Sequence, residues 1–105
     1  MKTITVQELQ TILSDSEHMK TAILIDVRTP EEFSQSHIPG AQNKPLDKIS
    51  LYLDALRTYK QIYVQCRTGG RSSAACGLLD QSGFVDAYNV EGGMSAWESA
   101  GFPIE

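Results

Sequence analysis

Cysteine and histidine are scarce in this sequence. Two cysteines, Cys66 and Cys76, and two histidines, His18 and His37, occur among the 105 residues. A secreted domain held together by disulfides normally carries more cysteines, and these scattered side chains lack the spacing of metal ligands. We therefore expect no disulfide framework, no bound metal and no cofactor.

Long apolar runs and an excess of positive charge are also absent. No stretch approaches the roughly 20 apolar residues of a membrane-spanning helix, and residues 1–8 lack the features of a signal peptide. The net charge of −4 and the pI of about 5.1 disfavour nucleic acid or an anionic membrane as the main partner. The sequence therefore predicts a cytoplasmic protein, which we expect to be a monomer or a weak dimer.

Short apolar runs alternate with helical patterns along the whole chain. A run that is apolar on both faces is typical of a central parallel strand, and residues 22–27 show this pattern. Strands are expected at Ile4 and over residues 22–27, 41–43, 61–65 and 85–90. This alternation predicts one α/β domain over residues 1–105, with a mostly parallel sheet and helices on both faces.

Helix-start signals separate these strands. Thr5 and Thr29 each begin a capping box, and Asp47 is expected to cap the helix that follows it. The expected helices begin after Thr5, Thr29 and Asp47, cover residues 73–82, and include Met94 and Trp97. In open parallel sheets, ligands bind beyond the carboxyl ends of the strands.

A cysteine, two glycines and two arginines occur together at one such strand end. The order along the chain is Cys66, Arg67, Thr68, Gly69, Gly70, Arg71 and Ser72. A loop between a strand and a helix start directs backbone N–H groups inward, and the helix dipole adds partial positive charge. This field favours the thiolate, which is the nucleophilic form of cysteine. We therefore predict that Cys66 is a catalytic nucleophile.

The other residues of this loop, Arg67 to Ser72, are predicted to bind the substrate. Arg71 is expected either to brace the loop or to face an anionic group of the substrate. A guanidinium binds oxyanions in a bidentate manner. Arg67 is expected to point outward and to steer anions. The two glycines permit backbone conformations closed to other residues, and Thr68 and Ser72 offer hydroxyl donors.

The loop length favours sulfur transfer over phosphoryl transfer. Four residues separate Cys66 from Arg71, one fewer than in the C-x5-R pattern of cysteine phosphatases, and the smaller ring of donors suits a single sulfur atom. In the predicted double displacement, Cys66 takes sulfur from thiosulfate or an organic persulfide. The Cys66 persulfide then passes it to a thiol, cyanide or a protein acceptor.

These residues resemble the active-site loop of the rhodanese family, and the resemblance extends over nearly the whole chain. Four motifs in the family's order carry it: Cys66–Arg71; Asp26–Arg28 with Pro30–Phe33; His37–Ala41 with Asn43 and Pro45; and Val90–Met94 with Trp97. The resemblance implies a rhodanese-like α/β fold with a five-stranded parallel core. It also implies a single-domain sulfurtransferase with Cys66 as the persulfide carrier.

Three other functions remain open at this point. The chain could be a sulfur-relay carrier for a partner protein, a cysteine-dependent phosphatase or arsenate reductase, or a recognition domain with an inert thiol. The two cysteines could also form a disulfide, although we interpret Cys76 as a small buried residue. Asp26 and Arg28 are interpreted as structural, either as a partly buried ion pair or through hydrogen bonds that fix neighbouring loops. The remaining conspicuous residues are assigned to turns, helix ends and the core: Glu31, Glu32, His37, Met94 and Trp97.

Overall fold

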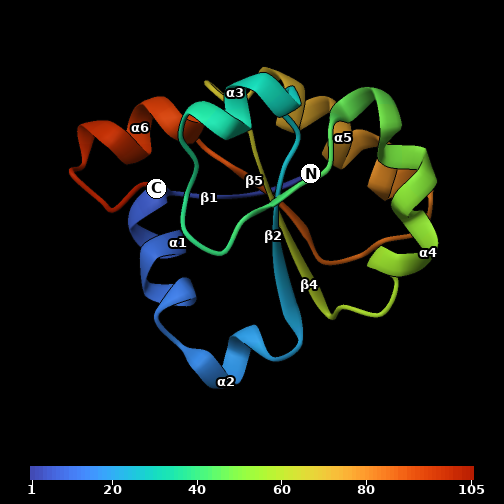
Figure 1. Ribbon diagram of the computed structural model, residues 1–105. Coiled ribbons are helices and arrows are strands. Elements are labelled where there is room, and N and C mark those ends of the chain that lie inside the picture. The colour runs from blue at the N-terminus through green and yellow to red at the C-terminus, as the bar shows by residue number, and fades with distance from the viewer.

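A five-stranded, fully parallel sheet lies at the centre of the computed structural model, which describes residues 1–105 (Figure 1). The strand order is β1-β5-β4-β2-β3. The strands are β1 (Lys2–Ile4), β2 (Ala22–Asp26), β3 (Gln42–Asn43), β4 (Gln61–Gln65) and β5 (Ala87–Val90). The predicted α/β class and the parallel sheet are confirmed.

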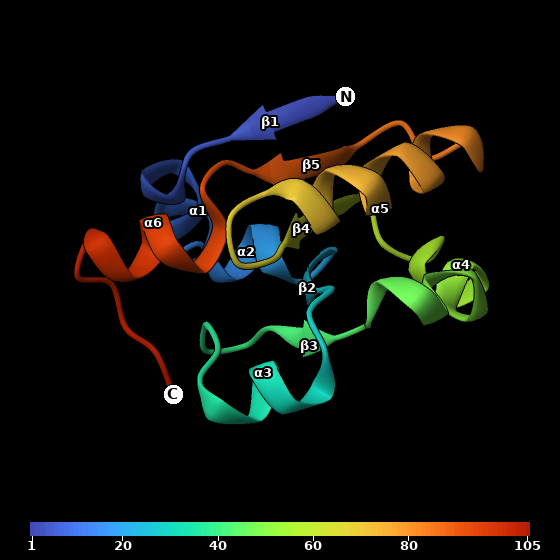
Figure 2. The ribbon, with the colours of Figure 1, turned by 90° about the horizontal axis from the view of Figure 1, so that it is seen from above.

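Helices cover both faces of this sheet, as expected (Figure 2). One side carries α1, α2 and α6, and the other carries α4, α5 and the 3-10 helix η1. The helices are α1 (Val6–Leu13), α2 (Ser16–Met19), α3 (Pro30–Gln35), η1 (Leu46–Tyr52), α4 (Leu53–Leu56), α5 (Gly70–Gln81) and α6 (Gly93–Ser99).

Strand β2, which lies between β4 and the edge strand β3, is buried over its whole length because it contributes to two apolar cores. Its side chains alternate between the faces of the sheet. Leu24 packs with Trp97 and the other residues of the α1 and α6 core, whereas Ile23 and Ile25 pack with Leu79 and the α5 core. Met94 and Trp97 are buried, which confirms their assignment to the core.

Two helix starts differ from the prediction. Helix α5 begins at Gly70, three residues before Ser73, because Gly69 occupies the N-cap with a φ of +115° and so ends the loop early. Asp47 caps no helix: Pro45 stands at the N-cap and η1 begins at Leu46. Both capping boxes are confirmed, since the side chains of Thr5 and Thr29 each accept the predicted backbone hydrogen bond.

The order of the strands creates a crevice between the carboxyl ends of β2 and β4. The connection after β2 leads to β3 on one side, whereas the connection after β4 leads to β5 on the other. Ligands of open parallel sheets bind where neighbouring connections diverge in this way. Cys66 directly follows β4 and Val27 directly follows β2, so the predicted nucleophile lies at this crevice.

The start of α6 docks directly against the backbone of the cysteine loop. The N–H of Met94 donates to the carbonyl of Cys66 at 2.8 Å, and the N–H of Ser95 donates to the carbonyl of Arg67 at 3.0 Å. Gly93 permits this approach, because a Cβ there would lie 2.1 Å from the Cys66 carbonyl oxygen. Two segments that are distant in sequence thus form one unit.

Replacing Gly93 by alanine is expected to cost considerably more stability than the same change at Gly40. Both glycines have positive φ, which costs an L-residue about 1–2 kcal/mol. Only Gly93→Ala adds a clash with backbone, so we expect a loss above about 3 kcal/mol. Urea unfolding of both variants measures the difference; equal losses would contradict this account of Gly93.

Candidate active site

The sulfur of Cys66 is buried beneath a ring of donors. The residue is 1% exposed, and its Sγ accepts hydrogen bonds from the backbone N–H groups of Gly69 at 3.1 Å and Ser72 at 3.4 Å. The hydroxyl oxygen of Ser72 lies 3.4 Å from the same sulfur. Gly69 and Ser72 come from the loop and from the first turn of α5, so the early start of this helix brings its N–H groups to the sulfur.

These donors favour the thiolate. Burial raises the pKa of the Cys66 thiol, but hydrogen bonds from the side chain and backbone of Ser72 and from the backbone of Gly69 and Thr68 lower it by more. The pKa of Cys66 therefore lies below its ordinary value. A thiolate at neutral pH is the reactive form of cysteine.

The Ser72 hydroxyl is shared between the sulfur and Asn89 of β5. Besides its contact with Cys66, this hydroxyl donates to Oδ1 of Asn89, and Nδ2 of Asn89 contacts the Gly69 carbonyl at 3.5 Å. A hydroxyl has one proton to donate, so stabilising the thiolate requires that proton to turn from Asn89 to the sulfur. Sequence reasoning missed Asn89; its only signal was a polar residue inside an otherwise apolar strand.

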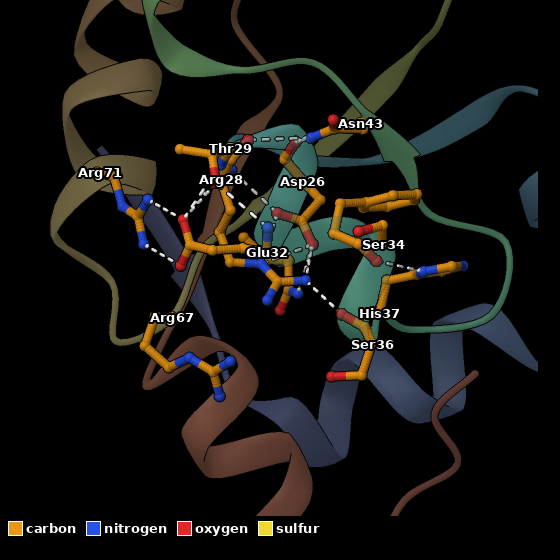
Figure 3. A network of polar contacts seen from close by, with 12 residues as sticks. Asp26, Arg28, Thr29, Glu32, Ser34, Ser36, His37, Asn43, Arg67 and Arg71 are labelled. Carbon is orange, nitrogen blue, oxygen red and sulfur yellow. Dashed lines mark hydrogen bonds and ion pairs between the residues drawn. The ribbon is translucent and has the colours of Figure 1, made fainter.

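Both arginines of the loop are paired with glutamates from other elements. Arg71 binds Glu32 of α3 through two hydrogen bonds of 2.6 and 3.0 Å (Figure 3). Arg67 binds Glu98 of α6 at 2.7 Å. Arg67 lies at the surface, as expected, but its guanidinium is held by a carboxylate. Arg71 braces the start of α5 against α3, which was one of its two expected roles.

The pairing with Arg71 holds Glu32 in its ionised form. The pKa of Glu32 is lowered to about 2, mainly by the hydrogen bonds from Arg71, and further by those from Thr29. Its N–H also completes the capping box with the Thr29 hydroxyl at 3.2 Å. Glu32 is therefore a first-turn helix residue, as the sequence predicted. It also connects α3 to the cysteine loop, a role that the sequence did not predict.

A buried ion pair lies behind this connection. Arg28 and Asp26 are both fully buried, and Nε and Nη2 of Arg28 donate to the Asp26 carboxylate at 2.7–3.0 Å. Arg28 also donates to the Ser36 carbonyl, and Nδ2 of Asn43 donates to the carbonyls of Asp26 and Arg28. Figure 3 shows how this network ties the end of β2 to α3 and β3. The structural interpretation of this pair is confirmed, although the pair is fully rather than partly buried.

The remaining predicted residues take different positions around the ring. Thr68 is exposed, and its backbone N–H contributes to the field at the sulfur. Gly70 is the exposed first residue of α5. Cys76 is buried in the apolar core, and burial raises its pKa to about 12. His37 stacks on Phe33 and contacts its carbonyl, in agreement with a role in the turn.

Comparison with known proteins assigns this arrangement to a family. A family model described as the rhodanese-like domain matches residues 5–100. A curated protein of Allochromatium vinosum named sulfurtransferase is 35% identical over 98 residues, which cover 93% of this chain and 89% of that protein. The chain belongs to the rhodanese-like domain family, as its motifs indicated.

Solved structures of the family agree with the fold. A rhodanese-related protein from Thermoplasma volcanium superposes with a TM-score of 0.83 at 30% identity, covering 100% of this chain and 98% of that one. A rhodanese-like domain protein from Staphylococcus aureus gives a TM-score of 0.76 at 41% identity, covering 92% and 91%.

The structure contains neither a candidate metal site nor a candidate membrane-spanning helix. No group of three or more histidine, cysteine, aspartate or glutamate residues is arranged to hold a metal ion. None of the helices has the length and apolar character needed to cross a membrane.

Removing the Ser72 hydroxyl is expected to raise the pKa of Cys66, because its hydrogen bond lowers that pKa. A hydrogen bond to a charged sulfur contributes about 1.5–3 kcal/mol, so Ser72→Ala should shift the alkylation profile upward by about one pH unit or more. Iodoacetamide labelling between pH 5 and 9, followed by peptide mass, measures this. Ser73→Ala on the same helix is the control; an unchanged profile for Ser72→Ala would refute this role for the hydroxyl.

The Glu32–Arg71 pair is expected to make stability depend on pH in the acid range. The pKa of Glu32 is about 2 in the folded protein and about 4.3 when unfolded, so its contribution is present above pH 5 and is lost as the pH falls toward 2. We expect about 1 kcal/mol at most, because both side chains are partly exposed.

Urea unfolding at pH 6 and pH 3 tests this pH dependence. Glu32→Gln should be less stable than wild type at pH 6 and should lose less stability between the two values, because glutamine does not titrate. Glu31→Gln, an exposed neighbour in the same helix turn, should keep the wild-type dependence. If Glu32→Gln and wild type lost the same stability between pH 6 and pH 3, the pH dependence could not be assigned to Glu32.

Proposed function

We propose that this protein is a sulfurtransferase that carries sulfane sulfur on Cys66. Its membership of the rhodanese-like family and its identity to a sulfurtransferase-named relative support the class. The observation that carries the proposal is the convergence of the Gly69 and Ser72 N–H groups on one buried sulfur atom. Such fixed donors stabilise negative charge where the reaction places it.

The first half-reaction transfers sulfur to the enzyme. The Cys66 thiolate attacks the outer sulfur of the donor and forms a new S–S bond, while the bond between that sulfur and the rest of the donor breaks. The remainder of the donor leaves: sulfite when the donor is thiosulfate, and a thiolate when it is an organic persulfide. The product is the Cys66 persulfide, whose negative terminal sulfur lies toward the N–H donors of the loop.

The second half-reaction returns the free cysteine. A thiol, cyanide or cysteine thiolate of an acceptor protein attacks the terminal sulfur of the persulfide, and the Cys66 thiolate leaves. The same hydrogen bonds stabilise that leaving group, because they lower the pKa of Cys66. Neither half-reaction needs a bound cofactor.

Activation of Cys66 in this proposal comes from the loop rather than from a general base. His18 is held by the hydroxyl of Tyr63 at 2.7 Å, and His37 is held at the turn after α3. Neither histidine contacts the sulfur. The backbone and the Ser72 hydroxyl are the groups that take the place of a base by favouring the thiolate.

Intact mass before and after incubation with a sulfur donor tests the proposal. Thiosulfate or glutathione persulfide should add one sulfur, about 32 Da by atomic weight, and a thiol should then remove it. Cys66→Ser should abolish the gain, whereas Cys76→Ser should retain it, because Cys76 lies in the apolar core. No gain in the wild type with either donor would reject sulfur transfer and would direct attention to phosphatase or recognition chemistry.

A further inference from the structure

A pocket of about 310 Å³ opens beside the cysteine loop. Its lining residues are Val27, Thr29, Pro45, Leu46, Asp47 and Arg71. Val27 follows β2 and Arg71 follows the loop after β4, so the pocket occupies the crevice between these strands. Val27 belongs to the same buried cluster as Cys66, and Leu46 packs against that cluster. Arg71, which ends the C-x4-R segment, also lines the pocket and so connects it to the loop that carries Cys66.

Both arginines of the loop have their positive charge paired. The Arg71 guanidinium is bound on two nitrogens by Glu32, whose carboxylate stays ionised at working pH. The charge of Arg67 is matched by Glu98. Neither arginine therefore offers an unpaired charge to compensate the second charge of a donor such as thiosulfate.

The pocket itself has apolar walls and an acidic outer rim. Val27, Pro45 and Leu46 form its apolar part. Asp47 lines it and also lines an adjoining hollow together with Glu31 and Lys48. Asp47 and Glu31 are exposed and make no ion pair. Since Lys48 offsets one of these two carboxylates, the rim keeps a net negative charge.

From this charge pattern we propose that the pocket binds the carbon part of a small organic persulfide that carries a positively charged group. The inference rests on the proposed sulfurtransferase function and specifies its donor class. The apolar walls contact the carbon chain, and Asp47 attracts the cation. The Cys66 thiolate takes the outer sulfur, the S–S bond of the donor breaks, and the carrier leaves as its thiolate, which then binds a proton.

The experiment compares three donors whose short carriers, of two or three carbons, differ in charge. They are the persulfides of cysteamine, 2-mercaptoethanol and 3-mercaptopropionate, which are cationic, neutral and anionic respectively. The rate of the 32 Da gain on Cys66 is measured by rapid quenching and intact mass. Each rate is divided by the rate of the same donor with free glutathione, which removes differences in intrinsic reactivity.

We expect the normalised rates to fall from the cationic to the anionic donor. A charge a few ångströms away in water changes a rate by about threefold, so the cationic and anionic donors should differ by about tenfold. The difference should shrink as salt is raised from about 0.05 M to about 0.5 M, because exposed charges are screened.

Three variants locate the effect. Asp47→Asn should bring the ratio of cationic to anionic donor toward one, whereas Asp54→Asn, an exposed aspartate of α4 outside the pocket, should leave the ratio unchanged. Glu32→Gln frees the Arg71 guanidinium and should increase thiosulfate loading relative to the cationic persulfide. Circular dichroism of each variant verifies folding before the rates are compared.

The outcomes separate this inference from the function on which it rests. If all donors load Cys66 at equal normalised rates, or if Asp47→Asn leaves the ratio unchanged, the donor class is wrong while sulfur transfer stands. If no donor adds sulfur to Cys66, the proposed function fails and this inference fails with it.

Discussion

The contact between the start of α6 and the backbone of the cysteine loop is the constraint on which the candidate site depends. Hydrogen bonds from Met94 and Ser95 hold the carbonyls of Cys66 and Arg67 and so fix the backbone at the start of the loop. Gly93 permits this approach, because a Cβ there would clash with the Cys66 carbonyl. A residue that is not among the donors to the sulfur therefore helps to position the loop that supplies them.

Ion pairs fix the same loop from two further directions. Arg71 is bound to α3 and Arg67 is bound to α6, each through a glutamate. Arginines beside a reactive cysteine suggest anion binding, yet here they join the loop to its neighbours. Uncharged dipoles, namely the Ser72 hydroxyl and the backbone N–H groups of the loop, lower the pKa of Cys66. Such dipoles act over a short range and favour a single negative sulfur more than a large, doubly charged anion.

Much of the fold was predictable because its determinants are local. The capping boxes at Thr5 and Thr29 place helix starts through hydrogen bonds within three residues. The apolar run of β2 indicates burial on both faces, and the structure shows it between two cores. Asp47 misled the prediction because Pro45 lies at the helix start instead. The start of α5 was misplaced because the positive φ of Gly69 depends on how the loop closes around the sulfur.

The sequence by itself determined the α/β class, the family and the cysteine of the candidate site, because apolar periodicity, capping residues and the segment from Cys66 to Arg71 are all short-range patterns. The tertiary structure alone decided which side chains meet that segment. Glu32, Asn89 and Glu98 reach the loop from elements 17 to 39 residues away in sequence. The β2–β4 crevice also arises from strand order, which brings Val27 and Arg71 to one pocket. Partners of this kind have no local signature, because their proximity results from sheet packing.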